Sequence, residues 1–352
     1  MTPAAPVPSA APAPRGGTAL VARLDNVGDV LLAGPAVRAV AAGADRVVML
    51  AGPRGRAAAD LLPGVDRVIE WCAPWIDPEP PPVDPARTDA LIAAVRAEAP
   101  SAALILTSFH QSGLPLALLL RLAGVPWIGA VSDDYPGSLL DLRHRGAWGA
   151  PEARRMLDLA EAAGYRLPPG DPGTPAVRRP LPDTAHLAGP PGYVAVHPGA
   201  SAAARAVPRH LAAGTVAALA ARGHRVVVTG TDSERADTAA VAGGAALDLG
   251  GRTKLVELAG VLAGASVLVS GNTGAAHLAA AVGTPVVSVF APVVPASAWA
   301  PQGVPVRVLG DQDAPCRGTR ARDCPVPGHP CVSGLTPDHV LAAVADLTGD
   351  PT

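Results

Sequence analysis

The sequence predicts an α/β protein that consists of two successive domains with parallel sheets. The chain has 352 residues against the roughly 150 of a typical domain, and 49% of them are hydrophobic, which is enough for two buried cores. Short β-rich apolar runs alternate with Ala- and Leu-rich segments from end to end, as in parallel sheets covered by helices. We therefore expect two Rossmann-like domains that face each other across a cleft.

The first domain is expected to span residues 18–166. Residues 1–17, rich in Pro and Ala, have almost no apolar side chain besides Val7 and are predicted to be a disordered tail. Strands are predicted near 18–24, 47–51, 67–71, 102–107 and 127–131. Helices are predicted near 31–42, 55–62, 86–99 and 113–123. The Pro-rich stretch 71–85 is expected to be a surface loop near the cleft.

The second domain is expected to span residues 193–352, after a linker. Residues 167–192 are interpreted as that linker because their many prolines remove backbone donors and prevent regular helix. Strands are predicted near 193–197, 225–230, 246–249, 267–270 and 285–290. Helices are predicted near 209–222, 233–242, 254–264 and 274–282.

Charge and composition exclude several classes of protein. Lys and Arg number 28 against 30 Asp and Glu, so there is no basic excess that would attract nucleic acid or an anionic membrane. The single lysine, Lys254, lies between Thr253 and Leu255 and so cannot belong to a P-loop. No G-x-G-x-x-G follows a strand, which disfavours a nicotinamide dehydrogenase. Without a transmembrane or signal-peptide segment, the protein is expected to be cytoplasmic.

The first of three glycine-bearing loops follows the strand at 18–24. Gly28 permits a tight turn, and Asp29 lies in the first turn of the next helix. Asp29 either complements the helix dipole or, facing the cleft, acts as a general base. In the first case Asp25 or Asn26 would cap the helix.

The second loop, residues 197–201, reads His-Pro-Gly-Ala-Ser. It presents backbone amides and the Ser201 hydroxyl to an anion, and Arg205 is close enough in sequence to add a positive charge. The alternative is an ordinary turn after a strand.

The third loop, residues 271–274, leads into a helix whose first turn has almost no side chains. Such a helix start accepts phosphate, and Gly271 and Gly274 would let a ligand reach the backbone. Asn272 or Thr273 can donate a hydrogen bond or cap the helix. His277, one turn further on, either points at the same anion or only packs.

In this order the three loops resemble those of glycosyltransferase family 9, the heptosyltransferase family with the GT-B fold. Residues 26–29 match its x-x-G-D turn, residues 197–205 its H-P-G-A-S and basic position, and residues 271–281 its G-D-T-G-x-x-H-L-A-A-A. Residues 331–340 match its cysteine-bearing tail, and the resemblance spans about residues 18–345. Asn272 replaces the usual aspartate, and Val207 replaces an aromatic residue.

The resemblance implies an inverting glycosyltransferase that needs neither metal nor other cofactor. It would move a heptose-like sugar from a nucleotide diphosphate donor such as ADP-heptose to an acceptor hydroxyl. Asp29 would take the acceptor proton, and Arg205 with the amides of 272–275 would stabilise the leaving diphosphate. Loops of the first domain, 71–85 and 109–113, would face the acceptor. Donor contacts are expected from Gly28, Ser201, Glu234, Asn272, Thr273, Gly274 and His277.

Glu234 follows a predicted strand, so it either binds the nucleotide ribose or simply begins a helix in solvent. Two other functions stay open: an inactive sugar-nucleotide-binding protein, favoured by Asn272, and a GT-B-like epimerase or hydrolase. Cys316, Cys324 and Cys331, with His329 nearby, lack the closely spaced ligand pairs of a zinc ribbon, so no metal site is expected there.

Overall fold

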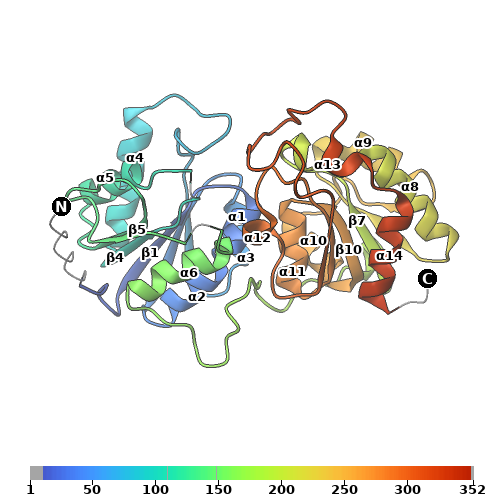
Figure 1. Ribbon diagram of the computed structural model, residues 1–352. Helices are drawn as coiled ribbons and strands as arrows, with labels where there is room; N and C mark the ends of the chain where they lie inside the picture. The colour runs from blue at the N-terminus through green and yellow to red at the C-terminus, as the bar shows by residue number, and fades with distance from the viewer. Residues whose placement is uncertain (1–10, 109, 148, 350–352) are drawn as a thin grey trace. The chain divides into compact units, whose positions relative to one another are not determined.

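The computed structural model describes residues 11–108, 110–147 and 149–349, and these form two six-stranded parallel sheets with helices (Figure 1). The chain divides into two compact units. The first unit comprises the chain up to Asp25, Ala33–Trp148 and Ala153–Gly173. The second comprises Asn26–Leu32, Gly149–Glu152 and the chain from Thr174 onward. The predicted α/β class with two Rossmann-like sheets is confirmed.

The sheet of the first unit has the strand order β3-β2-β1-β4-β5-β6, with every neighbouring pair parallel. This is the Rossmann order, in which the direction of winding reverses between β1 and β4. The central strands read as unbroken apolar runs because helices bury both faces of the sheet. The strands are β1 Thr18–Arg23, β2 Arg46–Ala51, β3 Arg67–Glu70, β4 Ala102–Ile105, β5 Ile128–Val131 and β6 Leu142–His144.

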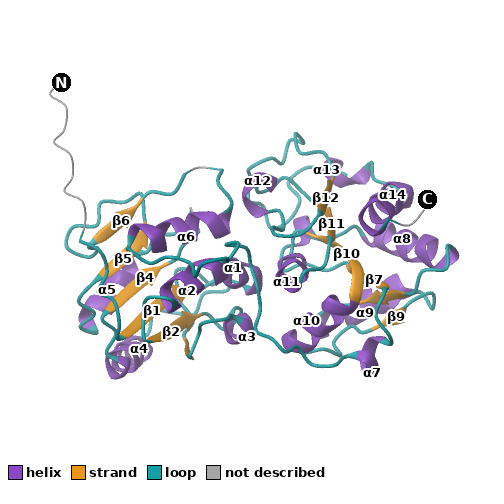
Figure 2. Ribbon diagram, turned by 90° about the horizontal axis from the view of Figure 1, so that it is seen from below, coloured by secondary structure: helices purple, strands orange, loops and turns teal. Residues whose placement is uncertain are grey.

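Helices cover both faces of this sheet. Leu91 and Val95 of α4 and Leu116 and Leu120 of α5 pack on the face that carries Leu20 of β1. Figure 2 shows α2 and α6 on the opposite face. The helices are α2 Gly34–Ala41, α3 Arg56–Leu61, α4 Pro85–Glu98, α5 Leu114–Leu122 and α6 Glu152–Ala162.

The sheet of the second unit repeats the same topology, with the order β12-β11-β10-β7-β8-β9 and all pairs parallel. Its winding reverses between β7 and β10. The strands are β7 Tyr193–His197, β8 Val226–Val228, β9 Leu247–Asp248, β10 Ala265–Gly271, β11 Val286–Val289 and β12 Val306–Leu309.

The core of the second unit lies mainly between its sheet and the helices α8, α9 and α14, represented by Val216, Val241 and Val344. Val261 of α10 packs with Tyr193 and Val227 in a separate cluster. The helices are α1 Val27–Leu32, α7 Ala185–Ala188, α8 Arg209–Ala221, α9 Arg235–Ala242, α10 Leu255–Gly264, α11 Gly274–Val282, α12 Ala296–Trp299, α13 Pro330–Ser333 and α14 Pro337–Thr348; η1 Ala203–Arg205 and η2 Asp232–Glu234 are 3₁₀ helices.

Several elements differ from the prediction. The helix expected at 31–42 is two helices, α1 and α2, because Pro35 can only stand in the first turn of a new helix. The edge strands β6 and β12 were not expected, since their sequences, Leu-Arg-His and Val-Arg-Val-Leu, are short and only partly buried. The helices α6 and α14 were also not predicted.

The tail was expected to be disordered from residue 1 to 17. Residues 1–10 lie outside the described part of the chain, but residues 11–17 pack on the first unit. Trp127 Nε1 donates to the Ala11 carbonyl at 3.1 Å, and the Ala13 amide donates to the Ala163 carbonyl at 2.9 Å. Side-chain donors of the unit therefore satisfy carbonyl groups of this Pro-rich stretch. Among the described residues, no helix is long and apolar enough to cross a membrane.

Candidate functional site

The carboxyl ends of β7 and β10 lie side by side where the winding of the second sheet reverses. His197, the last residue of β7, is in register with Ser270 near the end of β10. The His197–Ser201 loop and the loop that leads into α11 therefore begin next to each other. Open α/β sheets bind ligands at such a switch point. Every predicted site residue belongs to this second unit, including Gly28 and Asp29 of α1.

Two glycines allow the loops to approach closely. A Cβ atom on Gly271 would lie 2.0 Å from the carbonyl oxygen of Arg205, and one on Gly199 would lie 1.9 Å from Glu234 Oε1. A side chain at position 271 would collide with backbone, and one at position 199 would displace the Glu234 carboxylate. The space beside Gly271 that we assigned to a ligand is thus occupied by the backbone of Arg205.

Two further glycines bring α1 against the start of α11. A Cβ atom on Gly28 would lie 2.9 Å from His277 Cδ2, and one on Gly274 would lie 3.2 Å from Val27 Cγ1. Neither glycine has a positive φ, so each serves close packing, and the tight turn expected at Gly28 is not its role. On the side where a side chain of Gly274 would stand, α1 fills the space. This contact carries Asp29, in the first turn of α1, to the same edge of the sheet.

Asp29, Arg205 and His277 act on one another electrostatically. Burial lowers the pKa of His277 to about 4, with a smaller lowering from Arg205 and an opposing effect of the Asp29 carboxylate. His277 is therefore a neutral imidazole at pH 7. Burial also lowers the pKa of the Arg205 guanidinium, again opposed by Asp29. These two effects place one carboxylate within electrostatic reach of both a half-buried arginine and a buried histidine.

Buried polar atoms without partners gather here. Within the described part of the chain, Arg205 Nε, Asn272 Nδ2 and His277 Nδ1 have no hydrogen-bond partner. A buried polar atom left unpaired costs about 1–3 kcal/mol. Thr273, the residue before α11, makes no capping hydrogen bond with its side chain. The edge therefore retains unpaired polar groups that lie just below its surface.

Glu234 and His197 flank this edge. Glu234 Oε2 accepts from the Thr231 amide at 2.7 Å and the Thr231 hydroxyl at 2.8 Å, which closes a capping box at the start of η2. The helix-start role weighed for Glu234 is thus present, and its ribose contact stays a prediction. His197 Nδ1 lies 2.9 Å from Thr229 Oγ1, and burial lowers the pKa of His197. Ser201 is exposed beside them.

Sequence reasoning missed Arg322. Its backbone carbonyl accepts from the Ala204 amide at 2.8 Å, and its guanidinium donates to the Ser201 carbonyl at 3.0 Å. The one sequence signal was that Arg322 lies between Cys316 and Cys331, a stretch that we call the cysteine-bearing segment. That segment carried no expected role at the site.

Two of the three cysteines of that segment lie in the core of the second unit. Cys316 and Cys331 are both buried. Burial, and then the neighbouring Cys316 thiol, raises the pKa of Cys331 to about 12, with a smaller effect of Cys324. Among the residues that the structure describes, no group of three or more His, Cys, Asp or Glu side chains could hold a metal ion.

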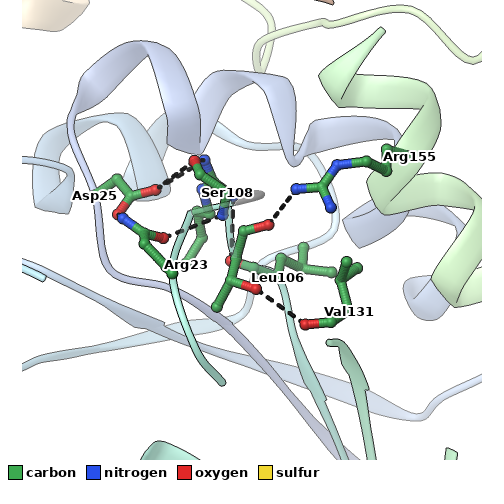
Figure 3. A network of polar contacts seen from close by, with 8 residues as sticks. Arg23, Asp25, Leu106, Ser108, Val131 and Arg155 are labelled. Carbon is green, nitrogen blue, oxygen red and sulfur yellow. Dashed lines mark hydrogen bonds and ion pairs between the residues drawn. The ribbon is translucent and has the colours of Figure 1, made fainter. Parts of the chain in front are cut away.

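The corresponding edge of the first sheet carries a different set of polar groups (Figure 3). Arg23 and Asp25 form a buried ion pair at 2.7 Å, and Arg23 also donates to Ser108 Oγ at 2.7 Å. Gln111 Nε2 donates to Asp25 Oδ1 at 2.7 Å, and Arg155 donates to the Thr107 carbonyl at 2.5 Å. Asp25, which we considered as a cap for the following helix, is part of this network.

Comparisons with known proteins bear on the whole chain. A family model described as glycosyltransferase family 9 (heptosyltransferase) matches residues 101–328. A search of curated proteins found no match. The E. coli ADP-heptose LPS heptosyltransferase II structure is similar with 18% identity, 94% of this chain and 98% of that chain covered, and a TM-score of 0.74. A family 9 glycosyltransferase from Veillonella parvula DSM 2008 has 14% identity, with 95% of this chain and 98% of that chain covered and a TM-score of 0.74.

E. coli heptosyltransferase WaaC is similar in two complexes. The one with ADP has 20% identity, 94% and 99% coverage of the two chains and a TM-score of 0.69. The one with ADP-2-deoxy-2-fluoro heptose has 22% identity, 94% and 99% coverage of the two chains and a TM-score of 0.68. These structures establish the GT-B fold. Because the family model covers more than half of its length, this chain belongs to glycosyltransferase family 9, the heptosyltransferase family.

Proposed function

We propose that the protein is an inverting glycosyltransferase that transfers a heptose-like sugar from a nucleoside diphosphate to an acceptor hydroxyl. One observation carries the proposal: Asp29, Arg205 and His277 converge at the switch point of the second sheet, beside buried polar atoms that have no protein partner among the described residues. The WaaC complexes contain ADP and an ADP-linked fluoro-heptose, so ADP-heptose is the first donor to test.

The donor diphosphate would lie against Arg205 and the first amides of α11. The guanidinium supplies a partly buried positive charge, and hydrogen bonds between charged groups are stronger than neutral ones. The start of α11 adds the positive end of the helix dipole. In this proposal these groups neutralise the leaving diphosphate without a metal ion, as the family resemblance implies.

The remaining site residues would orient the donor. The neutral imidazole of His277 and the amide of Asn272 each have a buried nitrogen without a partner among the described residues. A small shift of either side chain would let that nitrogen bind a phosphate or sugar oxygen. The Ser201 hydroxyl would contact the diphosphate, and Glu234 would accept hydrogen bonds from the ribose. Gly28 contributes indirectly, because it lets α1 approach His277.

Asp29 would act as the general base. Its carboxylate would take the proton from the acceptor hydroxyl while that oxygen attacks the anomeric carbon. The diphosphate would leave from the opposite face of the sugar, with inversion of configuration. The electrostatic effect of Asp29 on Arg205 supports this role, because the proton acceptor and the group that stabilises the leaving diphosphate would then belong to one site.

The acceptor would bind to loops of the first unit. Trp75 and Ile76 from one loop and Gln111 to Gly113 from the other line one small pocket next to Asp25. Phe109, which we also assigned to this surface, lies outside the described residues.

A second candidate is a sugar-nucleotide-binding protein without catalytic activity, favoured by Asn272 in place of the usual aspartate. A thermal-shift screen of the purified protein against nucleotide sugars identifies the donor, and a turnover assay with the stabilising donor then separates the two functions. Glycosyl transfer or donor hydrolysis supports an enzyme, and binding without turnover supports the alternative. In the second case, activity gained by Asn272→Asp would identify Asn272 as the inactivating residue.

A further inference from the structure

A second arginine is held at the same loop as Arg205. Arg322 lies between β12 and α13, and two hydrogen bonds fix it to the loop that follows β7. The Ala204 amide donates to the Arg322 carbonyl at 2.8 Å, and the Arg322 guanidinium donates to the Ser201 carbonyl at 3.0 Å. Ala204 is the residue directly before Arg205 in η1. The two arginines are therefore positioned by one short stretch of backbone.

The fold delivers Arg322 from an anchored segment. The Gly318 amide donates to the Pro292 carbonyl at 2.9 Å, and the Arg320 amide donates to the Val293 carbonyl at 2.8 Å, both just after β11. Cys316 and Cys331 are buried in the core of the second unit on either side of this stretch. Arg322 itself is exposed. A core-anchored segment with an exposed guanidinium at its centre places a charge at a defined point.

The charge of Arg322 has no acidic counterpart in the described part of the chain, whereas Arg317 of the same segment pairs with Asp313 at 2.7 Å. Arg322 is close enough to Arg205 for its charge to contribute to the lowered pKa of Arg205, after the larger effect of burial. Two like charges held close together are unfavourable, and among the described residues Asp29 opposes this effect at Arg205. A diphosphate carries enough negative charge to compensate for two guanidinium groups.

We infer that Arg322 is a second cationic residue of the donor site and binds the diphosphate together with Arg205. This inference rests on the proposed function. It assigns to the cysteine-bearing segment a role in the recognition of a nucleoside diphosphate over a nucleoside. The hydrogen bond to Ser201 holds one nitrogen of the guanidinium, and the other nitrogen atoms are available to phosphate oxygens.

The test is calorimetric titration of the full chain with ADP, UDP, GDP and CDP, followed by adenosine or the nucleoside that corresponds to the tightest diphosphate. Arg322→Gln removes the charge but keeps an NH₂ donor for the Ser201 carbonyl. We expect the Kd of the diphosphate to rise about 10- to 100-fold, because hydrogen bonds to a charged group contribute about 1.5–3 kcal/mol, while nucleoside binding stays unchanged. Arg317→Gln is the matched control and should leave both affinities as they are.

The outcomes separate the inference from the proposed function. If Arg205→Ala weakens diphosphate binding but Arg322→Gln does not, Arg322 only clamps the loop, and the inference is wrong while the proposed function stands. An equal loss of diphosphate and nucleoside affinity in Arg322→Gln would also overturn it. If the wild-type protein binds none of the four nucleoside diphosphates, the proposed function fails and the inference with it. Unchanged thermal unfolding of Arg322→Gln would show that the variant is folded.

Discussion

Both sheets of the protein place polar side chains at the switch point of their strands, yet the two edges differ in how those side chains are satisfied. Between β1 and β4, the ion pair of Arg23 with Asp25 is completed by Ser108 and Gln111 (Figure 3). Both terminal nitrogens of the Arg23 guanidinium donate hydrogen bonds, although its Nε atom does not. This edge is a closed network that needs no ligand.

Between β7 and β10, the corresponding edge is open. Arg205, Asn272 and His277 each have a buried nitrogen without a partner in the part of the chain that the structure describes. The same strand order therefore serves two purposes. At the first edge buried charges hold the unit together, and at the second edge the protein retains unpaired polar groups at a cost in stability. A bound anion would offset that cost, and this is the physical reason to look for the donor at the second edge.

The largest effect should come from Asp29→Asn. If Asp29 is the general base, turnover should fall by about 10²- to 10⁴-fold, because the neutral side-chain amide of the variant cannot take the proton from the acceptor hydroxyl. The affinity for the donor should stay nearly normal. Steady-state turnover and donor titration of the same preparation check both parts. Near-normal turnover would return Asp29 to the role of a residue that complements the dipole of α1.

Asp25→Asn tests the closed edge. Loss of the carboxylate leaves Arg23 buried without its counter-charge, so the free energy of unfolding measured in urea should fall by about 3–5 kcal/mol. Diphosphate affinity of the folded protein should not change. Combining Asp25→Asn with Arg23→Met removes the stranded charge and should recover part of the loss. A single variant as stable as wild type would show that this network contributes little.

Acid should lower the free energy of unfolding through His277, which lies at the open edge. His277 has a pKa of about 4 in the folded protein and about 6.5 when unfolded, so the unfolded chain binds the proton first as the pH falls. The contribution of His277 to stability is complete above pH 6.5 and is lost toward pH 4, a decrease of about 3 kcal/mol. Urea unfolding across this range should show that the free energy of unfolding of His277→Gln changes less steeply with pH than that of wild type. Part of the pH dependence should remain, because burial also lowers the pKa of His197. Equal slopes would contradict this origin.

The sequence predicted the elements that are apolar and locally bounded. The predicted helix at 274–282 coincides with α11, because Gly274 and Gly283 mark its two ends. The strand predicted at 193–197 likewise coincides with β7, a buried apolar run. The three loops were also identified locally, since each glycine pattern directly follows a strand.

Long-range contacts could not be predicted in this way. No periodicity indicates that α1 packs on α11, a contact that depends on Gly28 and Gly274 meeting across more than two hundred residues. The pairing of Arg322 with Ser201 joins residues 121 positions apart. The ion pair of Arg23 and Asp25 gains its partners Ser108 and Gln111 only when β4 lies beside β1. Each of these contacts requires the three-dimensional arrangement of the sheets.

The open edge of the second sheet, and not the closed edge of the first, should bind the donor diphosphate. Calorimetric titration of wild type, Arg205→Ala and Asp25→Asn with the tightest-binding nucleoside diphosphate and its nucleoside tests this most directly. Arg205→Ala should lose about 1.5–3 kcal/mol of diphosphate binding and less for the nucleoside, while Asp25→Asn binds both as wild type does. Unchanged diphosphate affinity in Arg205→Ala, or an equal loss for both ligands, would contradict the claim.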